Sequence, residues 1–272
     1  MTPRVDNHSH ILNADISKMV KSADTKGVAE LSITEHVSQF EELRERVRFG
    51  SVHSTGRLFK TLDEYVDEFE NIPEQSGVRV NRGLEVDYSP RFEAEVGNFV
   101  NQRDWDILLC SVHEFPNAKD VESSPENSSD SETAHERWRE YLRLEQMALE
   151  SDFVPFHVLS HPVRMSRGRL VEPPDMQQRL LNIANIAKKR EKALELNGND
   201  IGYSIRLVRM LAGACSTAGC KVSLGSDAHR PNDVFRNMDI AMGLVDEFHL
   251  SVLASRTKQR LENGRLRGYA VK

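Results

Sequence analysis

The sequence has no run of about 18 consecutive apolar residues, the length that an α-helix needs to cross a bilayer. Its opening residues, MTPRVDNHSH, lack both the basic and the apolar region of a secretory signal peptide. Cysteine is scarce: the chain has 3, Cys110, Cys215 and Cys220, too few and too irregularly spaced for a disulfide framework or a cysteine-based zinc site. We therefore expect a cytoplasmic protein that is neither inserted in a membrane nor held together by disulfides.

Several common catalytic motifs are also missing. The sequence contains no GxxxxGK[ST] phosphate loop, no GxSxG nucleophile elbow, no HExxH motif and no GxGxxG after the first expected strand. These absences argue against a P-loop nucleotide-binding protein, a serine hydrolase and a Rossmann dinucleotide-binding protein.

An excess of positive charge is absent too. The 36 lysines and arginines against 42 aspartates and glutamates give a net charge of -6, so no basic field attracts nucleic acid, which is not an expected partner. One local segment around His53 is net positive, and it contains Arg44, Arg46, Arg48, Arg57 and Lys60. This segment either attracts an anionic substrate or forms a solvated surface, and the sequence leaves both open.

Short β-type runs alternate with amphipathic helical stretches along most of the chain, which is typical of βα units around a parallel sheet. The seven expected strands end in DNHSH (6–10), LSITEH (31–36), VRVNRGLEVDY (78–88), WDILLCSVH (105–113), FHVLSH (156–161), ALELNG (193–198) and CKVSLGSDAH (220–229). Helices are expected near 15–26, 61–71, 90–103, 133–151, 174–190, 203–218 and 234–264, the last as two helices.

The segment 117–132 is poor in apolar residues, so we expect a mobile loop there, either a lid over a site or a plain insertion. No fixed-period repeat and no linker divides the chain, which predicts a single domain over residues 1–272.

Potential metal ligands end nearly every expected strand. They are His8 and His10, His36, Glu85, His113, His161, and Asp227 with His229. In a parallel barrel the C-terminal ends of the strands face one basin, so these side chains would converge there. Buried imidazoles and carboxylates each need a partner, and metal ions supply it. The pattern therefore predicts a multinuclear metal site.

The ordered set of these motifs resembles the polymerase and histidinol phosphatase (PHP) superfamily over almost the full chain. The matching motifs are D-x-H-x-H at Asp6, His8 and His10 followed by Asp15; T-E-H at Thr34 to His36; GLEVDY with Glu85; S-V-H ending at His113; S-H-P at Ser160 to Pro162; and G-S-D-A-H from Gly225 to His229. The resemblance implies an α/β fold, a distorted (β/α)7 TIM-like barrel that holds three divalent metal ions.

The same resemblance implies a ligand set for each ion. His8, His10, Glu85 and Asp227 would hold the first ion; Glu85, His113 and His161 the second; and Asp15, His36 and His229 the third. Glu85 would bridge two ions. Mixed nitrogen and oxygen ligands suit Zn, Fe or Mn, and the sequence does not choose among them.

By this resemblance the chain is expected to be a phosphatase, similar to the histidinol-phosphate phosphatase branch, in which a metal-bound hydroxide attacks a small phosphate monoester. Glu85, Asp227 and His229 are the expected catalytic residues. That branch reads N-T-A-G-L-R after the sixth strand, with the arginine helping to hold phosphate, whereas this chain reads NGNDIG over 197–202. Arg164 and Arg206 are the candidates to bind substrate in its place.

Two alternatives stay open. One is a PHP phosphoesterase that acts on nucleotides or nucleic-acid ends; the acidic net charge argues against polymers but not against mononucleotides. The other is a non-catalytic metal-binding regulatory module, against which the complete set of ligand positions argues. The oligomeric state cannot be read from the sequence.

Overall fold

The computed structural model describes residues 4–49, 56–73, 76–116, 121, 131–168, 170–253, 258–262 and 265–269. Most of the expected mobile loop at 117–132 lies outside these described residues, and so does His53.

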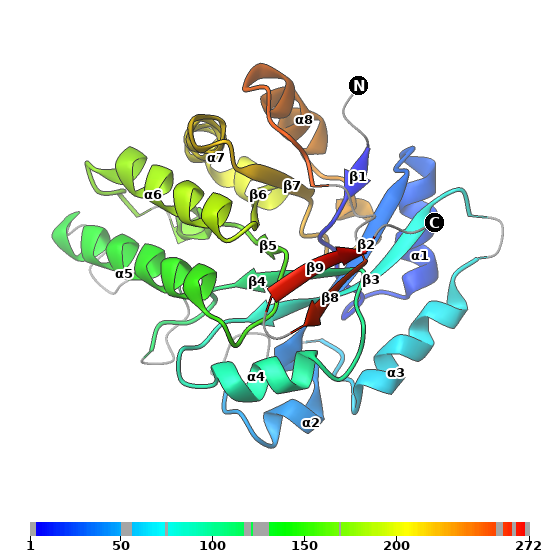
Figure 1. The fold of residues 1–272 in the computed structure, drawn as a ribbon. Helices are drawn as coiled ribbons and strands as arrows, with labels where there is room; N and C mark the ends of the chain where they lie inside the picture. Colours follow the sequence, from blue (N-terminus) through cyan, green and yellow to red (C-terminus); the bar gives the residue numbers. More distant parts are fainter. Residues whose placement is uncertain are drawn as a thin grey trace.

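Seven parallel strands form one sheet whose spatial order follows the chain (Figure 1). They are β1 (Val5–Asp6), β2 (Glu30–His36), β3 (Arg79–Asp87), β4 (Ile107–Ser111), β5 (Val158–Leu159), β6 (Ala193–Asn197) and β7 (Lys221–Gly225). Beside β1 and β7, the Asn7 N–H donates to the Leu224 carbonyl and the His10 N–H to the Ala228 carbonyl, each at 2.8 Å. The sheet therefore curls into a nearly closed barrel, which confirms the predicted fold class.

Helices surround this barrel (Figure 1). They are α1 (Ile16–Thr25), α2 (Glu41–Arg44), α3 (Leu62–Asp67), α4 (Glu93–Val100), α5 (Ser131–Glu150), α6 (Met176–Lys189), α7 (Gly198–Ala218) and α8 (Met238–Glu247), and the described residues also include four short 3-10 helices. In α6 the buried residues Met176, Leu180, Ile183 and Ala187 recur every three or four positions, so one face packs on the sheet. None of the helices in the described part of the chain could span a membrane.

The expectation of two helices over 234–264 is wrong in its second half. After α8 the chain forms an antiparallel pair, β8 (Lys258–Glu262) and β9 (Arg265–Tyr269). The sequence between these strands is Asn-Gly, the dipeptide that most favours a tight hairpin. The spacing of polar and apolar residues predicted a helix here, whereas the Asn-Gly dipeptide is typical of the hairpin that the two strands form.

The barrel interior changes from apolar to polar along its axis. On β4, Leu108 and Cys110 pack in the large core, whereas Ile107 and Leu109 belong to a small separate apolar cluster. Because successive strand residues face opposite sides, Ser111 continues the inward row beyond Leu109. The C-terminal ends of the strands therefore carry buried polar side chains, and the candidate site lies there.

Candidate metal centre

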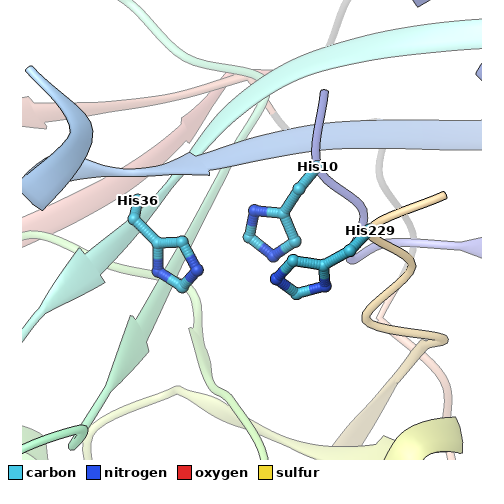
Figure 2. A group of neighbouring side chains, drawn as sticks. All are labelled: His10, His36 and His229. Atoms are coloured by element: carbon cyan, nitrogen blue, oxygen red, sulfur yellow. The ribbon is translucent and has the colours of Figure 1, made fainter. Parts of the chain in front are cut away.

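Six histidines and two carboxylates converge at the C-terminal ends of the strands. His8 and His10 follow β1, His36 ends β2, Glu85 lies in β3, His113 follows β4, His161 follows β5, and Asp227 and His229 follow β7. Figure 2 shows the rings of His10, His36 and His229 turned toward one another from separate segments. The ring centroids of His10 lie 4.5 Å from His36 and 4.4 Å from His229.

The carboxylate of Glu85 lies at the middle of this cluster. Its Oε2 lies 3.0 Å from His36 Nδ1 and 3.1 Å from His8 Nε2. Its Oε1 lies 2.9 Å from His161 Nε2 and 3.4 Å from His113 Nε2. One carboxylate thus faces imidazoles from four strands or their ends, as a bridging ligand must.

Asp227 forms a second focus, with its Oδ1 3.4 Å from His10 Nε2 and 3.7 Å from His8 Nε2. Among the described residues, three groups place one ligand atom of each member within 4.8 Å of the others: His10, His36 and His229; His8, His10 and Asp227; and His36, Glu85 and His113. These groups overlap at His10 and His36, so the cluster is one continuous centre.

The cluster fits divalent cations. Within the described part of the chain, Nε2 of His8, Nε2 of His10 and Oε2 of Glu85 are buried and have no hydrogen-bond partner. Buried polar atoms are seldom left unsatisfied, and imidazole nitrogen with carboxylate oxygen is a donor set for divalent transition metals. The protein is therefore built to bind divalent metal at this place.

Two buried glutamates that the sequence analysis did not single out support the histidines. Glu195 Oε1 lies 2.9 Å from His8 Nδ1, and its Oε2 accepts from the His161 backbone N–H at 2.8 Å. Glu35 Oε2 lies 3.7 Å from His10 Nδ1. A carboxylate at Nδ1 leaves Nε2 to face a metal. Their positions in the sequence could have indicated this role, because Glu195 lies within the sixth strand and Glu35 directly precedes His36.

Asp87 is a third buried carboxylate that supports the histidines of the centre. Its Oδ1 lies 2.7 Å from His113 Nδ1 and 3.6 Å from His36 Nδ1, while Oδ2 accepts from the Ser38 N–H. It stands two residues after Glu85 on β3, so both carboxylates share the inward face.

The charges of the cluster depend on one another. Burial alone would raise the pKa of Glu85, but the rings of His36 and His8 hold it well below its usual range. For Asp227, burial is likewise outweighed, here by the Arg164 guanidinium and His8, and the pKa is again far below normal. Burial, reinforced by Arg164, lowers the pKa of His161 to about 3. The carboxylates are thus ionised and His161 is neutral, the states that metal ligation requires.

Metal uptake by the metal-free protein is expected to strengthen as pH rises. Although burial disfavours their charged forms, Glu85 and Asp87 raise the pKa of His36 to about 10 and that of His113 to about 9. Both rings are therefore protonated at neutral pH and must lose a proton to bind metal. The stabilisation from these charged rings is complete below the unfolded pKa of 6.5 and is lost as pH rises through the folded values.

Calorimetric titration with zinc in buffers of different ionisation enthalpy measures this effect. Proton release near neutral pH that declines toward pH 10 is the expected result. Uptake without proton release would contradict the assigned charges.

The structure does not bring two of the predicted residues into the centre. Asp15 precedes α1, where its carboxylate is 69% exposed and pairs with Lys18 at 2.8 Å, so its role as a ligand stays a prediction. Arg206 lies beyond the non-helical Ser204 of α7 with its side chain 57% exposed and paired with Glu172, so its role in binding substrate also stays a prediction.

Arg164, by contrast, lies at the edge of the centre and is 4% exposed. Its Nη2 donates to Asp227 Oδ2 at 2.6 Å, and its Nε lies 2.8 Å from Asp200 Oδ1. Asp200 reaches this place because the Asn197 side chain caps α7 by accepting from the backbone N–H groups of Asn199 and Asp200. The segment NGNDIG thus supplies a buried carboxylate that holds Arg164 beside the cluster.

A small residue is required where β7 passes β6. A Cβ at Gly225 would collide with the Glu195 carboxylate and with the Cβ of His8. We expect Gly225→Ala to lower the free energy of unfolding by about 1–3 kcal/mol and, by displacing His8, to weaken zinc binding about 10- to 100-fold. Thermal unfolding and chelator competition measure the two effects.

Gly243→Ala is the matched control, because a Cβ there meets nothing within 4 Å inside α8. It should leave zinc affinity unchanged and stabilise the helix by up to about 1 kcal/mol. Equal behaviour of the two variants would contradict the close approach at Gly225.

A parallel barrel of seven strands with imidazoles and carboxylates gathered at its mouth is the arrangement of a metal-binding protein. The model of the PHP domain matches residues 7–199, and the chain belongs to this family. The predicted resemblance to the PHP superfamily is confirmed.

Three matches, from two organisms, show how far the similarity extends. The chain is 21% identical over 277 residues to the histidinol-phosphatase of Lactococcus lactis subsp. lactis (strain IL1403), with 95% of each covered. A crystal structure of histidinol phosphate phosphatase from that organism, complexed with zinc, L-histidinol and phosphate, matches with a TM-score of 0.75 at 21% identity over 97% of this chain and 98% of that one. A putative histidinol phosphatase from Listeria monocytogenes matches with a TM-score of 0.71 at 20% identity over 86% and 98%.

Proposed function

We propose that this chain hydrolyses a small phosphate monoester at the Glu85 centre, and that histidinol phosphate is the first substrate to test. The observation that carries the proposal is the position of Glu85, whose two carboxylate oxygens face separate imidazole groups at the mouth of the barrel. The relative with zinc, L-histidinol and phosphate in its structure supports the choice of substrate.

We assign three divalent ions, Zn, Fe or Mn, to the overlapping groups of side chains. His8, His10, Glu85 and Asp227 would hold one ion, and Glu85, His113 and His161 a second. His36 and His229, beside His10, would hold the third. Bound ions of this kind supply a water molecule of lowered pKa and positive charge against the phosphoryl oxygens.

The chain's own residues have distinct parts in this proposal. Asp227 and Glu85 orient the imidazoles, and Arg164, already held by Asp227 and Asp200, offers guanidinium charge to the substrate phosphate. His229 has a side chain 36% exposed and lies at the mouth of the barrel, so it is positioned to contact substrate. Its Nδ1 lies 3.1 Å from the Asp227 carbonyl oxygen; donation there leaves Nε2 with its lone pair.

Phosphate release by the zinc- or manganese-loaded protein tests the function. L-Histidinol phosphate, a mononucleotide and an aryl phosphate with an uncharged aryl group are compared under identical conditions, with the chelated protein as the control. Selective, metal-dependent release from L-histidinol phosphate is expected. A preference for the mononucleotide would move the proposal to a nucleotide phosphatase, and metal binding without hydrolysis of any ester would overturn it in favour of a regulatory module.

A further inference from the structure

The backbone at His161 has an unusual conformation. Its φ angle is 36°, in the left-handed region that residues with a Cβ seldom occupy. The next residue is Pro162, and a residue before proline prefers an extended backbone, so the local sequence disfavours this conformation as well. Strained residues of this kind persist only where the surrounding structure holds them, and they are concentrated at functional sites. Contacts that fix the backbone of His161 are therefore part of what builds the centre.

Three hydrogen bonds fix the peptide groups on the two sides of His161. Its backbone N–H donates to Glu195 Oε2 at 2.8 Å. Its carbonyl accepts from the Arg164 N–H at 2.9 Å and from the Tyr141 hydroxyl at 3.0 Å. The bond from Arg164 closes a tight turn inside the same loop, so it does not fix the loop against the rest of the fold. The bonds from Glu195 on β6 and Tyr141 on α5 do.

The Tyr141 ring is itself firmly held. It lies on the buried face of α5, where it is fully buried and packs edge-on against Trp138, with the ring centroids 6.1 Å apart. Trp138 Nε1 donates to the Leu170 carbonyl at 3.3 Å, which fixes this second ring in turn. The Tyr141 hydroxyl is therefore presented to the His161 carbonyl from a rigid support.

One acidic side chain lies close to this hydroxyl. Glu145 follows Tyr141 by one turn of α5 and is completely buried. Burial and the Asp200 carboxylate outweigh the effect of the Tyr141 hydroxyl and raise the pKa of Glu145 well above its usual range, so Glu145 is neutral at neutral pH. A neutral carboxyl accepts a hydrogen bond more weakly than a carboxylate does. The Tyr141 proton is thus left to the His161 carbonyl.

The backbone conformation of His161 decides where its imidazole lies. His161 Nε2 is 2.9 Å from Glu85 Oε1, and His113 Nε2 is 3.4 Å from the same oxygen. A rotation of φ toward the extended region would turn the Cα–Cβ bond and displace the ring from Glu85. A contact that holds the carbonyl therefore also holds the imidazole.

We propose that Tyr141 is a positioning residue: its hydroxyl holds the His161 carbonyl, and through it keeps the His161 ring where it completes a metal site with Glu85 and His113. Tyr141 itself touches neither metal nor substrate in this proposal. The inference rests on the proposed function, in which Glu85, His113 and His161 hold one divalent ion. The Ser-His-Pro motif contains His161 but gives no sign of a tyrosine 20 residues earlier.

Tyr141→Phe tests the proposal, because it removes one hydroxyl and keeps the ring. Tyr65→Phe is the matched control, since Tyr65 is equally buried and its hydroxyl donates to the carbonyls of Ile33 and Gly83 at 2.8 and 2.9 Å. Neither carbonyl belongs to a proposed metal ligand. Tyr65→Phe removes two buried hydrogen bonds, so an effect of structure alone should be at least as large there. His161→Ala shows the effect of losing the ligand.

The zinc retained per chain is measured at a series of free zinc concentrations, set by a metal buffer, for the wild type and the three variants. We expect one zinc ion per chain to dissociate from Tyr141→Phe at free zinc concentrations about tenfold higher than from the wild type. The same ion should be lost more completely from His161→Ala, and Tyr65→Phe should match the wild type within about twofold. The denaturant midpoint of the metal-free protein should fall at least as far in Tyr65→Phe as in Tyr141→Phe, which separates metal binding from stability.

The possible failures are distinguishable. Zinc binding by Tyr141→Phe that matches the wild type, or that falls equally in Tyr65→Phe, would overturn the positioning role of Tyr141 and leave the proposed function standing if His161→Ala loses an ion. Wild-type zinc binding by His161→Ala would show that His161 is not a ligand, and it would overturn the metal site on which both proposals rest.

Discussion

Replacing Glu85 by glutamine is expected to abolish phosphate ester hydrolysis while leaving the barrel folded. Glutamine keeps the shape of the side chain but removes the charge that faces His8, His36, His113 and His161. Loss of a bridging carboxylate removes both metal charge and its placement, so kcat/KM should fall at least about 1,000-fold, which is roughly 4 kcal/mol of transition-state stabilisation. Steady-state kinetics and metal analysis of the same preparation measure the effect.

Glu195→Gln is the graded comparison for this experiment. Glu195 contacts His8 only through Nδ1, on the side away from Glu85, so it orients a ligand without being one. Its replacement should cost about 10- to 100-fold in metal affinity or activity, clearly less than Glu85→Gln. Full activity and metal content in Glu85→Gln would contradict the bridging assignment, whatever Glu195→Gln does.

Replacing Arg164 by alanine is expected to have the largest effect on stability. Arg164 is buried between Asp200 and Asp227, and its removal leaves two buried carboxylates without their counter-charge. Breaking a buried ion pair in this way costs about 3–5 kcal/mol of the free energy of unfolding. Turnover should also fall sharply, because Asp227 faces His8 and His10. Denaturant unfolding and kinetics of the metal-loaded protein measure both.

Arg206→Ala is the matched control, since Arg206, which lies on α7, makes an ion pair with Glu172 at the surface. It should change stability by less than about 0.5 kcal/mol. Arg164→Lys keeps the charge but cannot reach both carboxylates with a planar fork, so it should fold better than Arg164→Ala and remain impaired. Equal effects of alanine at 164 and at 206 would contradict the distinction between them.

The barrel could be predicted from the sequence because strand-like and helix-like segments alternate along the chain and many of the strand-like segments end in a potential metal ligand. Apolar strand residues end in His or carboxylate side chains at His36, His113 and His161, and parallel strands bring such ends to one basin. The ends of α1 and α6 were expected within a few residues for the same reason, since their buried faces repeat at helical spacing. The sequence analysis predicted a helix where β8 and β9 form an antiparallel pair.

The details of the site depend on distances that no motif contains. Asp15 has the right residue type and position in the chain, yet Lys18 one helical turn later attracts its carboxylate to the surface. Asp200 stands where the family motif has no acid, and only the cap formed by Asn197 shows that it turns toward Arg164. Side chains that support a ligand from behind are set by three-dimensional packing, so spacing alone does not identify them.

The proposed function depends on Glu85 bridging divalent ions at the mouth of the barrel. Anomalous X-ray diffraction from crystals of the zinc-loaded protein, recorded on both sides of the zinc absorption edge, tests it most directly. Anomalous peaks are expected in contact with both carboxylate oxygens of Glu85, between the His8–Asp227 and His113–His161 sides of the cluster. Zinc bound elsewhere, or at a single position that does not touch Glu85, would contradict it.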